Sequence, residues 1–203
     1  MKQIPETIVL IETAKWLVKK GYSLNSISIP KGKGYTGNIK SIIEKELKNI
    51  GYDKKINYSS KGPDIIAENQ DEIWKIECKG LSSSDELGTH KNNFDRALAS
   101  VVTYFDSENK KQILALAIPS SLFYLQHLSR ISKPLRKILN LWILLIDESE
   151  HTIIDYKPDA DDNDIKRVTE QRKDKDKALK KALRKALKKD PELLKKINEC
   201  HIK

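Results

Sequence analysis

The chain has 203 residues, which is enough for one domain with a sizeable core. Its 38 lysines and arginines outnumber its 29 aspartates and glutamates, and the net charge of +9 favours a polyanionic partner such as nucleic acid. Two cysteines exclude a disulfide framework, and since no signal peptide is visible we expect a cytoplasmic protein. The longest apolar run, Leu141 to Ile146, is far too short to cross a bilayer, so no membrane partner is expected.

The N-terminal part of the chain is predicted to form helices and short strands. Apolar residues recur at helical spacing in two segments, and each segment is closed by a glycine, Gly21 or Gly51. The expected elements are helices at Pro5–Lys20 and Asn38–Ile50 and strands at Ile27–Pro30 and Lys54–Ser59.

A glycine-rich basic loop, residues 31–37, follows the first expected strand. Its backbone amides could cradle phosphates, and Lys31 and Lys33 are therefore candidate nucleic-acid contacts. A flexible connector explains this composition equally well.

A β-hairpin predicted at residues 64–79 carries the residues to which chemistry can be assigned. Two short strands with alternating apolar residues flank a polar turn. Successive side chains of a strand point to opposite faces, so Glu77 and Lys79 share one face while Cys78 lies on the other, which we expect to face the core. Asp64 opens the partner strand, where it can converge on the two charged residues.

Two carboxylates beside one lysine suit a metal-dependent phosphodiesterase. Asp64 and Glu77 can supply oxygen ligands to Mg²⁺, with Mn²⁺ as an alternative, and the backbone carbonyl of Cys78 can add a third. Lys79 would face the bound water or the scissile phosphate, where it could position the nucleophile or deprotonate it. A salt-bridged surface hairpin without catalytic function would carry the same residues.

Pro63-Asp64, followed by Glu77-Cys78-Lys79, resembles the signature of the PD-(D/E)XK nuclease superfamily. The resemblance extends roughly from Gly37 to Ile118 and implies a restriction-endonuclease-like fold. It implies that Asp64 and Glu77 bind the metal and that Lys79 is the catalytic lysine. It also implies Mg²⁺-dependent hydrolysis of a nucleic-acid backbone.

Members of this superfamily often add a carboxylate from the first core helix, which the sequence places at Asn38–Ile50. Glu46 falls inside the apolar stripe of that helix, where a carboxylate must be paired or bound to metal, so it is the candidate for a further metal ligand. The position that usually carries this acid falls near Lys40 instead. A surface salt bridge is the alternative explanation for Glu46.

The helix expected at Asn92–Phe105 carries a polar row. Asn92 and Arg96 are four residues apart and Asn93 adjoins them, and the resemblance implies that such residues support the site and contact phosphate. Arg96 is the strongest candidate because a guanidinium group binds phosphate well. Its alternative is an ion pair with Asp95 or another acid at the surface.

The next part of the chain alternates between strands and helices. This alternation predicts an α/β fold, with a restriction-endonuclease-like mixed central sheet flanked by helices and a basic helical C-terminal tail. The expected elements are strands at Gln112–Ile118, Leu141–Asp147 and Thr152–Tyr156 and helices at Leu122–Ile131 and Leu135–Leu139.

The chain changes character after Pro158, which divides it into a nuclease-like domain (1–158), a charged linker (159–176) and a basic helical tail (177–203). The tail holds 10 basic and 3 acidic residues, a net of +7. Arg184 and Lys185 represent a surface that could bind a nucleic-acid backbone. The same helix could instead pair with a second copy through its Leu/Ala face, or stay solvated.

The sequence thus predicts a Mg²⁺-dependent endonuclease that hydrolyses phosphodiester bonds of DNA, of the restriction, repair or defence type. Double-stranded DNA is the foremost expected partner, and a homodimer is a second. The alternatives are a non-cleaving nucleic-acid-binding module of the same fold, a junction resolvase and an RNA nuclease.

Overall fold

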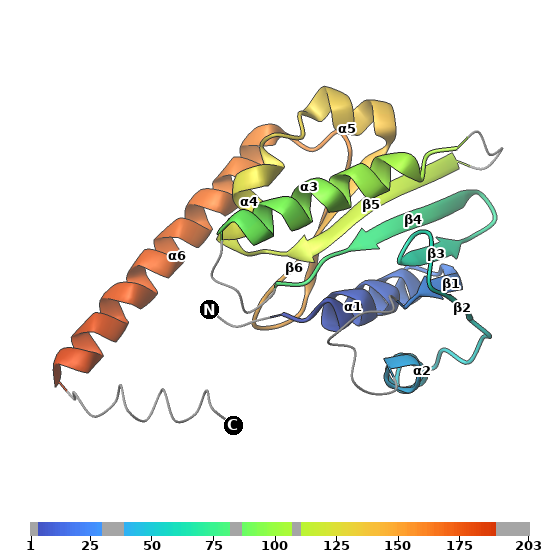
Figure 1. Ribbon diagram of the computed structural model, residues 1–203, viewed down its shortest axis with the longest axis horizontal. Coiled ribbons are helices and arrows are strands. Elements are labelled where there is room, and N and C mark those ends of the chain that lie inside the picture. The colour runs from blue at the N-terminus through green and yellow to red at the C-terminus, as the bar shows by residue number, and fades with distance from the viewer. Residues whose placement is uncertain (1–3, 30–38, 82–86, 107–110, 190–203) are drawn as a thin grey trace.

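The computed structural model describes residues 4–29, 39–81, 87–106 and 111–189 of the chain. It is an α/β fold with a mixed, seven-stranded sheet flanked by helices, which confirms the predicted fold class at this level (Figure 1). The strands are β1 (Ser23–Ser28), β2 (Asn57–Ser59), β3 (Ile65–Glu68), β4 (Glu72–Cys78), β5 (Lys111–Pro119), β6 (Leu141–Ile146) and β7 (Ile153–Tyr156). The helices are α1 (Glu6–Lys19), α2 (Ile39–Lys48), α3 (Leu87–Thr103), α4 (Leu122–Leu128), α5 (Lys133–Leu139) and α6 (Asp162–Lys189).

The sheet has the strand order β2-β1-β3-β4-β5-β6-β7. Its β1, β3 and β4 strands are antiparallel neighbours, whereas β4, β5 and β6 run parallel. A parallel pair needs a crossover connection, and α3 provides it between β4 and β5. The carboxyl ends of β4, β5 and β6 therefore meet at one edge of the sheet, which we call the catalytic edge because the residues predicted to be catalytic lie at the end of β4.

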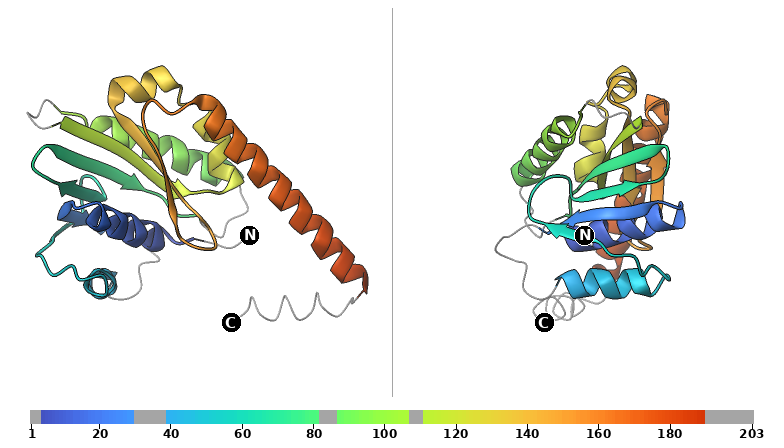
Figure 2. Two further views of the ribbon diagram at one scale, coloured as in Figure 1. Left: turned by 180° about the vertical axis from the view of Figure 1, so that it is seen from behind. Right: turned by 90° about the vertical axis from the view of Figure 1, so that its right-hand side faces the viewer.

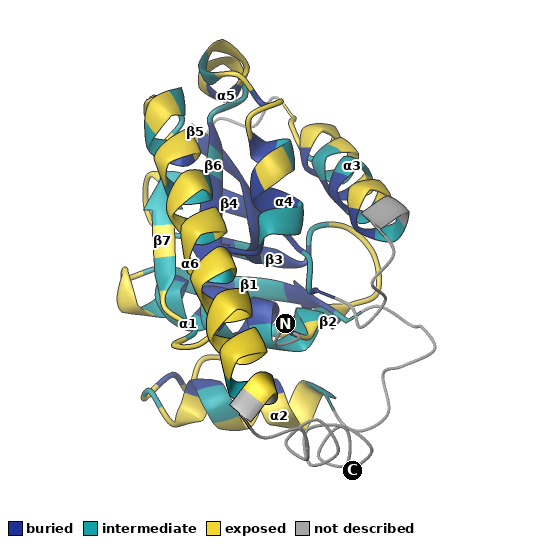
Figure 3. Ribbon diagram, turned by 90° about the vertical axis from the view of Figure 1, so that its left-hand side faces the viewer, coloured by how far each residue is buried: buried dark blue, intermediate teal, exposed yellow. Residues whose placement is uncertain are grey.

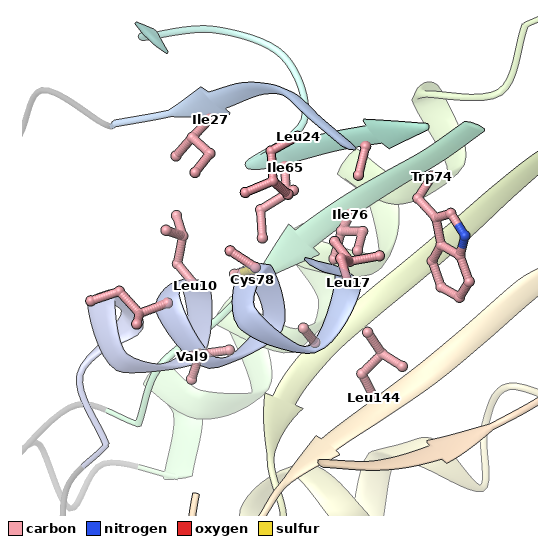
Figure 4. Close-up of a cluster of buried hydrophobic side chains, with 14 of the residues drawn as sticks. Val9, Leu10, Leu17, Leu24, Ile27, Ile65, Trp74, Ile76, Cys78 and Leu144 are labelled. Carbon is pink, nitrogen blue, oxygen red and sulfur yellow. The ribbon is translucent and has the colours of Figure 1, made fainter. Parts of the chain in front are cut away.

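Two clusters of buried apolar side chains sandwich the sheet. On one face, α1 packs against Ile65, Trp74, Ile76 and Cys78, and Figure 4 shows these side chains directed toward the helix. The other face packs against α3, α4 and the first turns of α6. The predicted alternation along β4 is therefore confirmed, because its odd-numbered residues lie on the opposite face from Cys78.

The strand that precedes the hairpin in the chain, β2, differs from the prediction. Lys54–Ser59 was expected to be the first core strand, but only Asn57–Ser59 is extended, and it lies at the sheet edge next to β1.

The side chains of β1 do not alternate regularly between the two faces of the sheet, because its pairing with β3 contains an irregularity between Leu24 and Ser26. Leu24 and Ile27 consequently both reach the core although they are three residues apart.

The segment expected to be a charged linker, 159–176, is helical from Asp162 onward, because a single helix runs from Asp162 to Lys189. Arg136, only 1% exposed, pairs with Asp162 at 2.8 Å, and Ile165 is buried in the core. Acidic residues in the first turn also suit the positive end of the helix dipole. The later turns of α6 leave the body of the protein, where Figure 3 shows them as mostly exposed. Among the described residues, no helix is both long and apolar enough to cross a membrane.

Candidate active site

The β3–β4 hairpin brings Asp64 and Glu77 together. Ile65 pairs with Ile76 across the hairpin, so the next position along places Asp64 opposite Glu77. Because Ile65 and Ile76 face α1, both carboxylates lie on the other face of the sheet. They are largely buried, at 8% and 6% exposure. The backbone N–H of Cys78 donates to Asp64 Oδ2 at 2.7 Å, which fixes the orientation of this carboxyl group.

Lys79 completes the predicted set of catalytic residues. Its Nζ lies 2.9 Å from Glu77 Oε1 and 3.6 Å from Glu6 Oε2. The backbone N–H of Lys79 donates to the carbonyl of Ala117 at 2.9 Å, which extends the pairing of β4 with β5. The lysine is therefore held by the parallel part of the sheet, while the carboxylates come from the antiparallel hairpin.

Glu6, the first residue of α1, belongs to the site although the sequence analysis did not single it out. Gly80 permits its approach, since a Cβ at this position would lie only 2.2 Å from Glu6 N. The N–H of Leu81 also donates to the carbonyl of Ile4 at 2.7 Å, which connects the start of α1 to the segment after β4. In the sequence Glu6 is marked only as an acid in the first turn of the helix that precedes the first strand, which does not locate it at the site.

Tyr104, directly after α3, is a second residue that sequence reasoning missed. Its hydroxyl donates to Glu77 Oε2 at 2.6 Å and lies 3.4 Å from the carbonyl of Gly62. Burial, followed by the hydrogen bond to Glu77, raises the pKa of Tyr104, so the hydroxyl keeps its proton and donates. No local pattern marks this residue, because the contact spans 27 positions of sequence.

The site concentrates negative charge in a poorly solvated place. Burial, then repulsion from Glu77, raises the pKa of Asp64 to about 7, and the more distant Glu6 adds to this effect. Burial alone would lower the pKa of Lys79, but the carboxylates of Glu6 and Glu77 outweigh it and raise the pKa. Lys79 is therefore a cation near neutral pH.

The donor set of this site is consistent with a hard divalent cation. Asp64 and Glu77 offer carboxylate oxygens from facing positions, and oxygen is the ligand that Mg²⁺ and Mn²⁺ prefer. The Cys78 side chain packs in the core, so this residue has only backbone atoms to offer. Within the described part of the chain, no three acidic, histidine or cysteine side chains converge into a ready metal cluster. The fit is thus to two protein carboxylates, with the remaining positions left to water or substrate.

Glu46, predicted to be a further metal ligand, lies away from Asp64 and Glu77 and forms an ion pair instead. Glu46 lies on α2 and pairs with Lys15 of α1 at 3.4 Å. Lys15 follows Glu6 by nine residues, which is about 13 Å along the helix. The helix that serves the catalytic edge is α1, because α2 is inserted between β1 and β2 and packs against α1 from outside.

The predicted nucleic-acid contacts are scattered in the structure. On α3, Asn92 and Arg96 are exposed and Asn93 is half-buried. The neighbouring Asp95 pairs with Arg130 at 3.0 Å. On α6, Arg184 and Lys185 are exposed. Lys31 and Lys33 lie outside the described residues.

Comparison with known proteins adds no independent assignment. No model of a protein family, no curated protein and no solved structure matches this chain. Any functional conclusion therefore depends on the arrangement of Asp64, Glu77, Lys79, Glu6 and Tyr104.

Proposed function

We propose that this protein is a Mg²⁺-dependent endonuclease that hydrolyses phosphodiester bonds of DNA. The observation that carries the proposal is the placement of Asp64 opposite Glu77, with Lys79 Nζ 2.9 Å from Glu77. With α2 and β2 set aside as an insertion after β1, the elements follow the order α1-β1-β3-β4-α3-β5, with a crossover after the hairpin. This order supports a restriction-endonuclease-like core of the PD-(D/E)XK kind.

The roles of the residues follow from their charges. Asp64 and Glu77 would hold Mg²⁺, which supplies an activated water and stabilises charge that develops on the phosphate. Lys79 has a raised pKa and so acts as a cation beside the scissile phosphate rather than as the base. Glu6 holds the ammonium group from one side and Glu77 holds it from the other, which fixes where its charge acts.

The expected substrate is double-stranded DNA, because the chain carries a net charge of +9 while its proposed catalytic site is acidic. A negatively charged site repels DNA unless a bound cation neutralises the site. Basic surfaces elsewhere on the protein must also attract the DNA. The proposal therefore needs both a divalent cation at the carboxylates and a basic surface near the catalytic edge.

Cleavage assays with one substitution and one matched control test the proposed function. Plasmid, single-stranded and branched DNA are incubated with the protein in Mg²⁺ or in EDTA. We expect Mg²⁺-dependent cleavage, and for Lys79→Ala a loss of about a hundredfold or more in rate, with DNA binding retained. Lys111→Ala is the control, because it removes a lysine of the neighbouring strand that pairs with Glu72.

Two outcomes would count against the proposal. Undiminished cleavage by Lys79→Ala would remove the assigned role of the lysine. Binding of DNA without cleavage under any of these conditions would favour the non-cleaving module.

A further inference from the structure

The far half of α6 carries basic residues for which the described part of the chain shows no ion pair. Residues 162–176 contain five acidic and five basic residues, whereas residues 177–189 contain seven basic residues and no acid. The ion pairs of α6 within the described chain all involve residues up to Asp176, such as Lys173 with Glu170 at 3.1 Å. Beyond that point the helix presents lysines and arginine to solvent.

These cations share one face of the helix and form a groove with α4. The groove has a volume of about 960 Å³, and Leu122, the first residue of α4, contributes to its wall. We call the basic residues along it the α6 basic row. They recur every three or four positions, as neighbours on one helix face do: Lys173, Lys177, Lys180, Lys181, Arg184, Lys185 and Lys188.

The groove adjoins the catalytic edge. Two residues after Leu122, the hydroxyl of Tyr124 donates to the carbonyl of Gly80 at 2.7 Å, and Gly80 directly follows Lys79. In Figures 1 and 2, α6 passes α4 and runs outward beyond the ends of the parallel strands. A ligand bound at the carboxylates and extending past α4 would therefore meet the α6 basic row.

The helix is held firmly enough to present this row. Buried Arg136 donates from Nη1 to Asp162 and to the carbonyl of Ile131, and from Nη2 to the carbonyl of Ala160. Farther along, Arg172 pairs with the buried Glu148. Since no glycine or proline interrupts residues 162–189, the far turns continue the direction set by the anchored ones.

We propose that the α6 basic row binds the phosphate backbone of a DNA duplex outside the scissile bond. The proposal rests on the proposed nuclease function for its choice of partner. The row runs from Lys173 to Lys188, about 22 Å along the helix. At 3.4 Å of rise per base pair this matches about six base pairs of duplex.

An anionic membrane surface is the competing partner, and the helix is poorly suited to it. Membrane-surface helices bury a broad apolar face with aromatic residues. Residues 177–189 contain no aromatic side chain, and the exposed apolar residues described on this stretch are Leu179 and Leu183, at 69% and 45% exposure. The charge-rich face is the one that lines the groove.

The test compares two triple variants with the same change in net charge. Lys180→Gln, Arg184→Gln and Lys188→Gln remove charge from the row, and glutamine keeps helix propensity. Lys45→Gln, Lys137→Gln and Lys175→Gln are the control, because these lysines are exposed but lie outside the groove. Binding of a long duplex is measured in EDTA across a salt series, so that cleavage plays no part.

The row variant should bind duplex about tenfold or more weakly at moderate salt, with a salt slope shallower by about 2.7, while the control keeps the wild-type slope. Circular dichroism checks that both variants keep their helix content. Equal behaviour of the two variants, or wild-type binding to anionic vesicles and not to duplex, would overturn the proposal.

Failure of this inference can be told apart from failure of the nuclease proposal. If binding depends on the row but Mg²⁺ supports no cleavage, the inference holds and the nuclease function fails. If the protein cleaves DNA and the row variant binds like the control, the nuclease function stands and the inference fails.

Discussion

Glu77 is oriented from both sides by neighbouring groups. Lys79 Nζ lies 2.9 Å from its Oε1, and the hydroxyl of Tyr104 donates to its Oε2 at 2.6 Å. Each carboxylate oxygen has two lone pairs, so these contacts leave capacity for a metal ion. In the proposed function Tyr104 would be a positioning residue, because its hydrogen bond fixes the orientation of the Glu77 carboxylate.

Replacing Tyr104 with phenylalanine removes this hydrogen bond and little volume. We expect the Mg²⁺ concentration for half-maximal cleavage to rise about tenfold, because groups that orient metal ligands typically contribute that much to affinity. The rate at saturating Mg²⁺ should change little. The assay is cleavage against Mg²⁺ concentration.

Tyr22→Phe is the matched control for this experiment. It removes the 2.5 Å hydrogen bond from the Tyr22 hydroxyl to Glu72, at the opposite end of the same strand. If both variants need the same Mg²⁺ concentration as the wild type, Tyr104 does not position Glu77 for metal.

The position of Glu6 in the site depends on the close approach of α1 to the end of β4. Gly80 is the contact point, where a Cβ would lie 2.2 Å from Glu6 N and 2.7 Å from the carbonyl oxygen of Ile4. Both neighbours are backbone atoms, which cannot move aside alone. Any side chain at position 80 must therefore displace the start of the helix and, with it, Glu6.

Gly80→Ala should lower the free energy of unfolding by about 2 kcal/mol through overpacking. It should also slow cleavage by about a hundredfold, because small displacements of catalytic groups cost that much. Urea denaturation and cleavage rates, the latter at a temperature where the variant is folded, measure both effects.

Gly21→Ala separates lost stability from lost geometry. Gly21 has φ of 88°, which strains an alanine, yet no neighbouring atom lies within 4 Å of its added Cβ. This variant should lose stability and keep its cleavage rate. A similar loss of rate in both glycine variants would assign the Gly80 effect to stability alone.

The hairpin could be predicted because its determinants are local. Alternation sets its two faces, and Asn69 Oδ1 accepts hydrogen bonds from the N–H groups of Asp71 and Glu72 in the turn. Glu6 and Tyr104 could not be predicted, because their places depend on packing between distant segments. The start of α6 was missed for the same reason, since the docking of its polar first turn depends on the buried Arg136.

Ionisation of Asp64 lowers the free energy of unfolding of the whole protein. Its pKa is raised from 3.8 to about 7 by burial and by Glu77, so the folded protein binds this proton more tightly than the unfolded chain does. The resulting stabilisation is complete below about pH 4 and is lost as the pH rises through 7. A cation bound at the carboxylates would replace the proton at higher pH.

Asp64→Asn tests this coupling, since asparagine keeps an oxygen that can accept the Cys78 N–H. In EDTA, the wild type should lose about 2–4 kcal/mol more stability than the variant between pH 4 and pH 8. Adding Mg²⁺ at pH 8 should stabilise the wild type and not the variant. Urea denaturation measures each value, and parallel pH profiles without a Mg²⁺ effect would contradict the assignment.

Because β1 pairs directly with β3, α2 and β2 form an insertion between two neighbouring strands of the sheet. Ile27 pairs with Ile65, and the N–H of Ser28 donates to the carbonyl of Asp64, so the sheet closes beside the hairpin without α2 or β2. The inserted elements α2 and β2 hold none of the five site residues, and Asp64 stands where the chain re-enters the sheet at β3. The segment that carries α2 and β2 could therefore change in length without moving the strands that position Asp64 and Glu77.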